Sequence, residues 1–254
     1  MIEARELSIH VEGRRLVSGV SFTVDRGRVL ALAGESGIGK SLVAAALVGM
    51  LPGGAQRGGT LLLDGEAMTD AHLRAVRGQR IALAPQPLSS LDPSARIEDQ
   101  FRWAARRAGL PRMARKAAAA ASLARLGLPE RTCDLYPHHL SGGMARRIIL
   151  GIATVGRPQV LIVDEPTSGL DGANVAHVAG DLRRLASDGC AVIVITHDLV
   201  FASGFADAIA VLSPGGFAAP MPASAFVADG ADIPDAHARG LWRATPANGM
   251  TVDA

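Results

Sequence analysis

The sequence is poor in cysteine and has no long apolar segment. Cys133 and Cys190 are the only cysteines, and they are far apart with no Cys-x-x-Cys pair, which argues against a disulfide framework and fits a reducing cytosol. No apolar run approaches the ~18 residues that a membrane-spanning helix requires. The first residues, MIEARELSIHVEG, carry charges early and lack the apolar core of a signal peptide.

The sequence is also poor in lysine and in net charge. Charged residues make up 20% of the chain and the formal net charge is +2, so the composition gives no indication of nucleic-acid binding. The positive charge is almost all arginine, and Lys40 and Lys116 are the only lysines. The 254 residues, of which 48% are hydrophobic, suffice for a sizeable core in one large domain or two small ones.

Strand and helix patterns alternate along the chain. The short β-branched runs VLIVDE at 160–165 and CAVIVITH at 190–197 are typical of buried parallel strands. Alternating apolar and polar residues at 7–11 and 21–24 predict antiparallel, half-exposed strands. Further strands are predicted at 28–33, 59–63, 80–84 and 208–213, and helices at 41–51, 172–187 and shortly after 197. The alternation predicts an α/β fold with a parallel sheet covered by helices.

Changes in composition divide the chain into four segments. Residues 1–92 contain the antiparallel strands and the first glycine-rich loop, and 93–156 contain Ala and Arg at helical spacing, typical of an inserted helical subdomain. Strand–helix alternation resumes over 157–213. Residues 214–254 form a Pro-, Gly- and Ala-rich extension, and we expect its last ten or so residues to be poorly ordered.

The stretch GESGIGKS at 34–41 matches the phosphate-loop pattern G-x-x-x-x-G-K-[ST], with a predicted strand before it and a predicted helix after it. In this pattern backbone N–H groups surround the β-phosphate, Lys40 reaches the β- and γ-phosphates, and the Ser41 hydroxyl is a ligand of Mg²⁺. The alternative is a plain glycine-rich turn. The predicted nucleotide-binding residues are Gly34, Glu35, Ser36, Gly37, Ile38, Gly39, Lys40, Ser41 and Leu42.

The strand VLIVDEP ends in two adjacent carboxylates, Asp164 and Glu165. Such neighbours repel each other unless a cation or a proton is present. Beside a phosphate loop, Asp164 is predicted to support Mg²⁺ through water, and Glu165 to act as the general base for the attacking water. The alternative is a strand terminus with two solvated acids.

Two more polar side chains follow predicted strands. His197 ends AVIVITH and Gln86 follows IALA, and the carboxyl ends of parallel strands converge on a ligand crevice. His197 is predicted to contact the γ-phosphate and to hold the water and Glu165 in line. The amide of Gln86 is predicted to contact Mg²⁺ or water without adding charge.

A second glycine-rich helix start, LSGGMARR at 140–147, follows the helical insertion. Helix N-termini of this kind bind phosphate groups through backbone N–H groups and the helix dipole. A minimal nucleotide hydrolase needs only one such element, so its presence calls for an explanation.

The motifs and their order resemble the nucleotide-binding subunits of ABC transporters from about residue 7 to 213. GESGIGKS is similar to the Walker A loop, Gln86 to the Q-loop, LSGGM to the signature, VLIVDE to Walker B, SGLD at 168–171 to the D-loop, and His197 to the switch histidine. The resemblance implies a P-loop NTPase with a RecA-like parallel sheet, an N-terminal antiparallel β-subdomain and an inserted α-helical subdomain. It implies ATP and Mg²⁺ as cofactors, with Ser41, Gln86 and Asp164 at the metal.

The family architecture also explains the second helix start. ABC ATPases form head-to-tail dimers in which each ATP lies between the phosphate loop of one subunit and the signature of the other. Ser141, Gly142, Gly143 and Asp171 would therefore contact nucleotide across the interface. The implied partners are a second ATPase subunit, identical or different, and two transmembrane permease subunits. A substrate-binding protein acts indirectly, and the implied location is the cytoplasmic face of the membrane.

Within the family, the chain is most similar to the importers of nickel and of di- and oligopeptides, through APQPLSSLDP, YPHHLSGGM and HARGLW. Uptake of nickel or another metal chelate is the main prediction, and peptide uptake is the alternative. A soluble ABC ATPase without a transport role and a regulatory module without catalysis are the remaining alternatives. The family's adenine-stacking aromatic residue is missing, because its position falls near Val11 and His10 is the only ring nearby.

Overall fold

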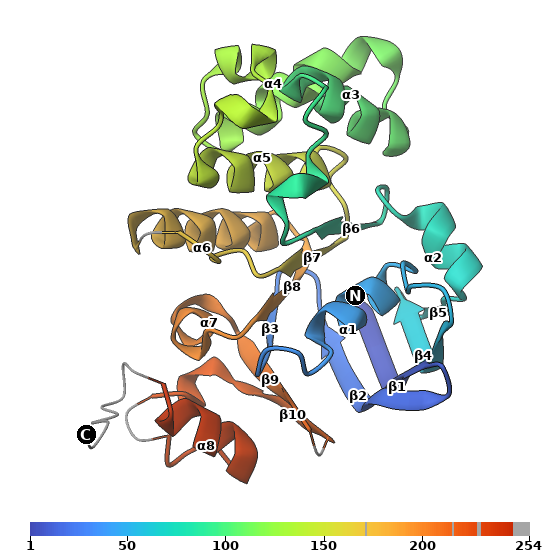
Figure 1. Cartoon of the computed structure of the whole chain (residues 1–254), viewed down its shortest axis with the longest axis vertical. Helices are drawn as coiled ribbons and strands as arrows, with labels where there is room; N and C mark the ends of the chain where they lie inside the picture. The colour runs from blue at the N-terminus through green and yellow to red at the C-terminus, as the bar shows by residue number, and fades with distance from the viewer. Residues whose placement is uncertain (171, 215, 228–229, 246–254) are drawn as a thin grey trace.

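The computed structural model describes residues 1–170, 172–214, 216–227 and 230–245 (Figure 1). The strands are β1 Ile2–Val11, β2 Arg14–Val24, β3 Val29–Gly34, β4 Ala55–Leu63, β5 Glu66–Ala67, β6 Ile81–Ala84, β7 Val160–Asp164, β8 Ala191–Thr196, β9 Ala208–Ser213 and β10 Gly216–Pro222. The α-helices are α1 Lys40–Leu47, α2 Asp70–Val76, α3 Ile97–Arg107, α4 Arg115–Arg125, α5 Gly142–Thr154, α6 Gly172–Ser187, α7 Leu199–Phe205 and α8 Ala236–Arg243. Short 3-10 turns lie at Leu88–Ser90, Arg112–Ala114, Glu130–Asp134, Pro137–His139 and Ala223–Ala225.

A six-stranded sheet in the order β10-β9-β3-β8-β7-β6 forms the centre of the molecule. Strands β9, β3, β8, β7 and β6 pair in parallel, and β10 pairs with β9 antiparallel. All six residues of β3 and of β8 are buried, because helices or the second sheet cover both faces. The predicted α/β fold with a parallel core is confirmed.

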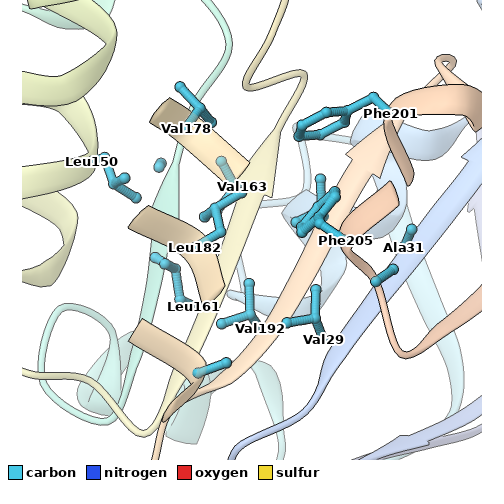
Figure 2. Close-up of a cluster of buried hydrophobic side chains, with 14 of the residues drawn as sticks. Val29, Ala31, Leu150, Leu161, Val163, Val178, Leu182, Val192, Phe201 and Phe205 are labelled. Atoms are coloured by element: carbon cyan, nitrogen blue, oxygen red, sulfur yellow. The ribbon is translucent and has the colours of Figure 1, made fainter. Parts of the chain in front are cut away.

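Apolar side chains of the central strands alternate between two cores. Figure 2 shows the first core, in which helices α5, α6 and α7 pack on one face of the sheet. Its labelled members are Val29, Ala31, Leu150, Leu161, Val163, Val178, Leu182, Val192, Phe201 and Phe205. The intervening strand residues, such as Leu30 and Ile193, face the second core, together with α1 and the N-terminal strands. The period-2 alternation therefore fixes which helix lies on which face.

The N-terminal antiparallel sheet has the order β2-β1-β4-β5. Strand β1 is longer than the predicted 7–11, because the burial alternation changes phase at a β-bulge between Ala4 and Leu7. Glu6, within the bulge, has a positive φ of 50°. A bulge inserts an extra residue and interrupts the period-2 pattern, so the pattern alone indicated only the second half of the strand.

Helix α1 begins at Lys40 but ends at Leu47, before the predicted end at 51. Gly49 has a φ of +66°, and its N–H donates to the Ala46 carbonyl at 3.3 Å while the Met50 N–H donates to the Ala45 carbonyl at 2.7 Å. This pair of bonds is a Schellman motif, which ends a helix at a left-handed glycine.

The predicted helical insertion is present as α3, α4 and α5, at the top of Figure 1. After Ser213 the sequence analysis predicted no element, yet β10 and α8 lie there. β10 is an edge strand that contains prolines, which weaken a strand signal. Trp242 of α8 is 4% exposed and packs edge-to-face on Phe226 at 5.8 Å.

The expectation of poor order at the chain end concerns residues that fall mostly at 246–254, outside the described part. Among the described residues, no helix is long and apolar enough to cross a membrane.

Candidate functional site

The loop between β3 and α1 depends on glycine at both ends. Gly34 has a φ of +152°, and a Cβ there would lie 2.4 Å from the Leu212 carbonyl oxygen. Gly39 caps α1 with a φ of +103°, and a Cβ there would lie 2.7 Å from Cγ2 of Val17. Side chains at these positions would clash with backbone or core, so glycine alone allows the loop to close over the helix start.

Lys40 lies beneath this loop. It is 6% exposed, and its Nζ donates to the carbonyl oxygens of Gly34 and Glu35, both at 2.7 Å. Burial lowers the pKa of Lys40, and the nearby carboxylates of Glu165 and Asp164 oppose that shift. The loop thus surrounds a cation that is short of solvent, as a site for an anion requires.

Asp164, the last residue of β7, faces the same region. Burial raises the pKa of Asp164, the Glu165 carboxylate raises it further, and Ser41, Lys40 and Arg146 lower it. Its Oδ1 is buried and has no hydrogen-bond partner in the described part of the chain. A buried carboxylate oxygen without a partner, close to a serine hydroxyl, fits the oxygen ligands that Mg²⁺ requires.

Glu165 and His197 form a direct pair. Nδ1 of His197 lies 2.9 Å from both Oε1 and Oε2 of Glu165. Glu165 is 7% exposed and adopts a positive φ of 47°, a conformation uncommon for a residue other than glycine. Its N–H donates to the Ile195 carbonyl at 2.8 Å, so the ends of β7 and β8 hold the two side chains together.

Gln86 follows β6 and is joined to the signature helix α5 by Arg146. The Arg146 guanidinium donates from Nη1 to the Gln86 carbonyl and from Nη2 to the Ser168 carbonyl, the latter at 3.3 Å. The sequence motifs assign no role to Arg146. No local pattern reveals it, because its partners are distant in sequence.

The signature residues begin α5. Ser141 is the N-cap, and its Oγ accepts the Met144 N–H at 3.3 Å. Ser141 and Gly142 are exposed, and a Cβ on Gly143 would lie 2.9 Å from Oδ1 of Asn174.

The structure places these residues apart from the phosphate loop. Helix α5 packs into the first core and α1 into the second, on opposite faces of the central sheet, and Figure 1 shows α5 among the upper helices, away from α1. The phosphate loop and the predicted metal and catalytic side chains instead gather at the carboxyl-terminal ends of the central strands. The phosphate loop follows β3, Asp164 ends β7 and is followed by Glu165, and His197 follows β8. Asp171 lies outside the described residues.

The surface beside the phosphate loop is aliphatic and basic. Val11 is half-buried and pairs with Arg14 across the β1–β2 hairpin, and His10 pairs with Arg15. Leu16 is 48% exposed, next to the Val17 that packs on Gly39. Arg14 and Arg15 are exposed, so this hairpin presents a branched aliphatic and two guanidinium groups where the family has an aromatic ring.

Comparisons with known proteins agree with this geometry. Residues 17–168 match the family model described as ABC transporter. The chain is 38% identical over 210 residues to the oligopeptide transport ATP-binding protein OppD of Mycobacterium bovis, a match that covers 78% of this chain and 34% of that protein. It is 35% identical over 215 residues to the probable peptide ABC transporter ATP-binding protein y4tR of Sinorhizobium fredii, covering 78% of this chain and 64% of that one.

The chain thus spans less than two thirds of the length of these relatives. A solved structure described as the ATP binding subunit of an ABC transporter superposes with a TM-score of 0.75 at 25% identity, covering 89% of this chain and 91% of the other. The family model covers more than half of the chain, and the phosphate loop and signature helix lie within the matched residues. The chain therefore belongs to the ABC transporter family, of which it contains the ATP-binding domain.

Proposed function

We propose that this chain is the ATP-hydrolysing subunit of an ABC importer that takes up peptides. The Glu165–His197 pair beside a complete phosphate loop carries the hydrolytic part of the proposal. The relatives support the substrate class, since they are named for oligopeptide and peptide transport. They give no support to nickel, so the alternative from the sequence replaces the main prediction.

The phosphate loop and Lys40 would bind the triphosphate. In the structure Lys40 donates to two loop carbonyls, and these bonds hold its ammonium group at the centre of the loop. A triphosphate would compete for the same protons, and its charge would relieve the cost of burying Lys40. Ser41, Asp164 and Gln86 would hold Mg²⁺, which supplies neutralising charge to the phosphate oxygens.

Glu165 would accept the proton of the attacking water. Both of its oxygens face His197 Nδ1, so the imidazole holds the carboxylate in one orientation. When Nδ1 carries the hydrogen and donates to Glu165, the lone pair of Nε2 can accept a hydrogen from the attacking water, and a doubly protonated ring could donate from Nε2 to a γ-phosphate oxygen. In that arrangement His197 aligns the base and the water, and Glu165 removes the proton.

Ser141, Gly142 and Gly143 would act on the nucleotide of a partner subunit. Helix α5 is 13 residues long, and its exposed N-terminus lies on the other face of the sheet from α1. Its N–H groups and dipole are available to a phosphate that this chain's own loop does not hold. A head-to-tail dimer would bring the phosphate loop of one chain to the Ser141 helix start of the other. Permease subunits would complete the importer at the cytoplasmic face of the membrane.

Uptake assays in a strain that lacks this chain test the substrate class. We expect the deletion to abolish uptake of a labelled oligopeptide and to leave nickel uptake unchanged, and the wild-type chain to restore peptide uptake. A Glu165→Gln chain serves as the matched control, because it is expected to assemble without restoring uptake. Loss of nickel uptake with intact peptide uptake would overturn the proposed substrate.

A further inference from the structure

A cavity lies at the amino-terminal ends of the central parallel strands, opposite to the ends that carry the phosphate loop, Glu165 and His197. Its volume is about 420 Å³, within the range of small-molecule sites. The segments that precede β3, β7 and β8 form one wall, and the ends of α4, α5 and α6 form the other. The lining residues are Arg26, Arg125, Thr154, Arg157, Pro158, Gln159, Leu185, Asp188, Gly189 and Cys190.

Positive charge predominates among the side chains that line this cavity. Three arginines line the cavity against one acid, Asp188. Arg26 forms an ion pair with Asp64 at 2.9 Å, but Asp64 also accepts from Arg80 at 3.2 Å. The N-terminal ammonium group of Met1 also pairs with Asp64, at 2.8 Å. One carboxylate is thus shared among three cations, so Arg26 is only partly neutralised.

Arg125 and Arg157 have no ion pair in the described part of the chain. Arg125 is half-buried and makes one long hydrogen bond, from Nη2 to the Ser122 hydroxyl at 3.3 Å. Arg157 is exposed, and no hydrogen bond to its side chain is present among the described residues. Burial and the nearby Arg157 and Arg184 lower the pKa of Arg125, and the Asp188 carboxylate opposes that shift. The guanidinium groups are therefore close enough to repel one another, and one acid offsets the repulsion in part.

A structural role at a helix end accounts for the neighbouring Arg184, but not for the side chains of Arg125 and Arg157. Arg184, in the last turn of α6, donates to the Arg125 carbonyl at 2.8 Å and to Asp181 at 3.2 Å. That is the ordinary role of a cation at a helix C-terminus. The backbone N–H of Arg157 donates to the Thr154 carbonyl at the end of α5, at 2.9 Å. Its guanidinium group donates to no helix carbonyl in the described part, so the side chain has no comparable structural function.

We propose that this cavity binds a small phosphorylated anion. The planar guanidinium groups of Arg125 and Arg157 offer paired N–H donors that match phosphoryl oxygens, and Arg26 adds a third cation. A volume of about 420 Å³ exceeds what a single phosphate needs and suits a compact metabolite with two phosphoryl groups. The site is separate from the ATP site, because the five- and six-residue strands β7 and β8 span roughly 17–20 Å.

Calorimetric titration of fructose 1,6-bisphosphate into the whole 254-residue chain tests the proposal. The phosphate loop is first saturated with Mg²⁺ and ADP, so that the probe reports on the second site. We expect one equivalent to bind. Arg157→Gln is expected to weaken binding about tenfold, because it removes a charge-assisted donor pair. Asp188→Asn is expected to tighten binding, because it removes the only acid in the wall.

Arg102→Gln is the matched control, since Arg102 is an exposed arginine on α3 paired with Asp99. It changes the net charge as Arg157→Gln does, but away from the cavity, and is expected to leave the affinity unchanged. Two results would overturn the proposal: no saturable binding, or equal weakening by Arg102→Gln and Arg157→Gln. Thermal unfolding of each variant verifies that it is folded.

Discussion

At the scale of single residues, Glu165 has the burial, the backbone conformation and the hydrogen-bond partner expected of a preorganised base. It is 7% exposed, its backbone is held in a left-handed conformation, and both carboxylate oxygens lie 2.9 Å from one imidazole nitrogen. Glu165→Gln keeps the size and the capacity to hydrogen-bond while removing the proton acceptor. We therefore expect ATP binding to persist and turnover to fall about 100-fold or more, the contribution typical of a general base.

Phosphate release under saturating ATP, with nucleotide binding measured by fluorescence titration, checks this expectation. Glu98→Gln is the matched control, because Glu98 lies in the first turn of α3, away from the phosphate loop. Turnover near the wild-type rate in Glu165→Gln would contradict the base assignment.

Asp164 is expected to lower the stability of the fold while it serves the proposed activity. Its pKa is raised, mainly by burial, so the folded state disfavours its charged form. The penalty applies above the raised pKa, where the folded state holds the charged form, and is lost as the pH falls through that pKa. Asp164→Asn is therefore expected to raise Tm by about 2–4 °C at neutral pH, and to abolish turnover by removing the carboxylate that we propose supports Mg²⁺.

Thermal unfolding across a pH series from acidic to neutral tests whether the charge of Asp164 destabilises the fold. The gain in Tm should shrink as the pH falls, because the wild-type carboxylate then becomes protonated. Asn in place of the exposed Asp25 should change Tm little at any pH. A destabilised Asp164→Asn chain at neutral pH would show that the charge of Asp164 stabilises the fold.

At the scale of elements, sequence patterns located the central strands and failed where geometry departs from periodicity. β3 and β8 were predicted because apolar residues face two cores and form continuous runs. The first half of β1 was missed because a bulge shifts the alternation. β10 was missed because an edge strand with prolines has no distinctive pattern.

In the candidate site, too, the sequence predicts the residues that belong to a motif and misses the contacts that depend on tertiary packing. Motif spacing located the phosphate loop, Asp164, Glu165 and His197, and the order of parallel strands implied that their ends converge. The link from Arg146 to the carbonyls of Gln86 and Ser168 could not be predicted. Contacts between a side chain and distant backbone carbonyls depend on tertiary packing, and no local pattern encodes them.

The β1–β2 hairpin offers a test of base recognition. Val11 is half-buried and lies opposite Arg14 near the phosphate loop, at the position that the resemblance assigns to the adenine-stacking residue. Stacking of a base on an aromatic ring contributes about 1–3 kcal/mol. Val11→Tyr is therefore expected to tighten ATP binding about fivefold or more.

Affinity for inorganic tripolyphosphate, which has no base, should be unchanged in Val11→Tyr. The comparison of the two ligands separates stacking from an effect on the loop. Equal changes for ATP and tripolyphosphate would show that the hairpin acts on the phosphate site instead.

At the scale of the whole molecule, we propose that two incomplete sites explain why the chain has two glycine-rich helix starts. Helix α1, which follows the phosphate loop, and helix α5, which begins after Ser141, pack on opposite faces of one sheet, so the two helix starts cannot close on a single nucleotide without a large rearrangement. An interface between two copies, each contributing a different surface to each site, would complete both. Lys40→Ala disables the loop half of the site and Gly143→Asp the signature half, the latter by placing a carboxylate beside Asn174.

Each variant alone is expected to be inactive, but an equal mixture should recover activity. Half of the dimers then pair one chain of each kind, and such a dimer has one intact site built from the loop of the Gly143→Asp chain and the signature of the Lys40→Ala chain. Independent sites would restore about a quarter of the wild-type turnover. The mixture is assayed for phosphate release after exchange of subunits, which labelled chains verify. An inactive mixture with exchanged subunits would contradict sites shared between two copies of this chain.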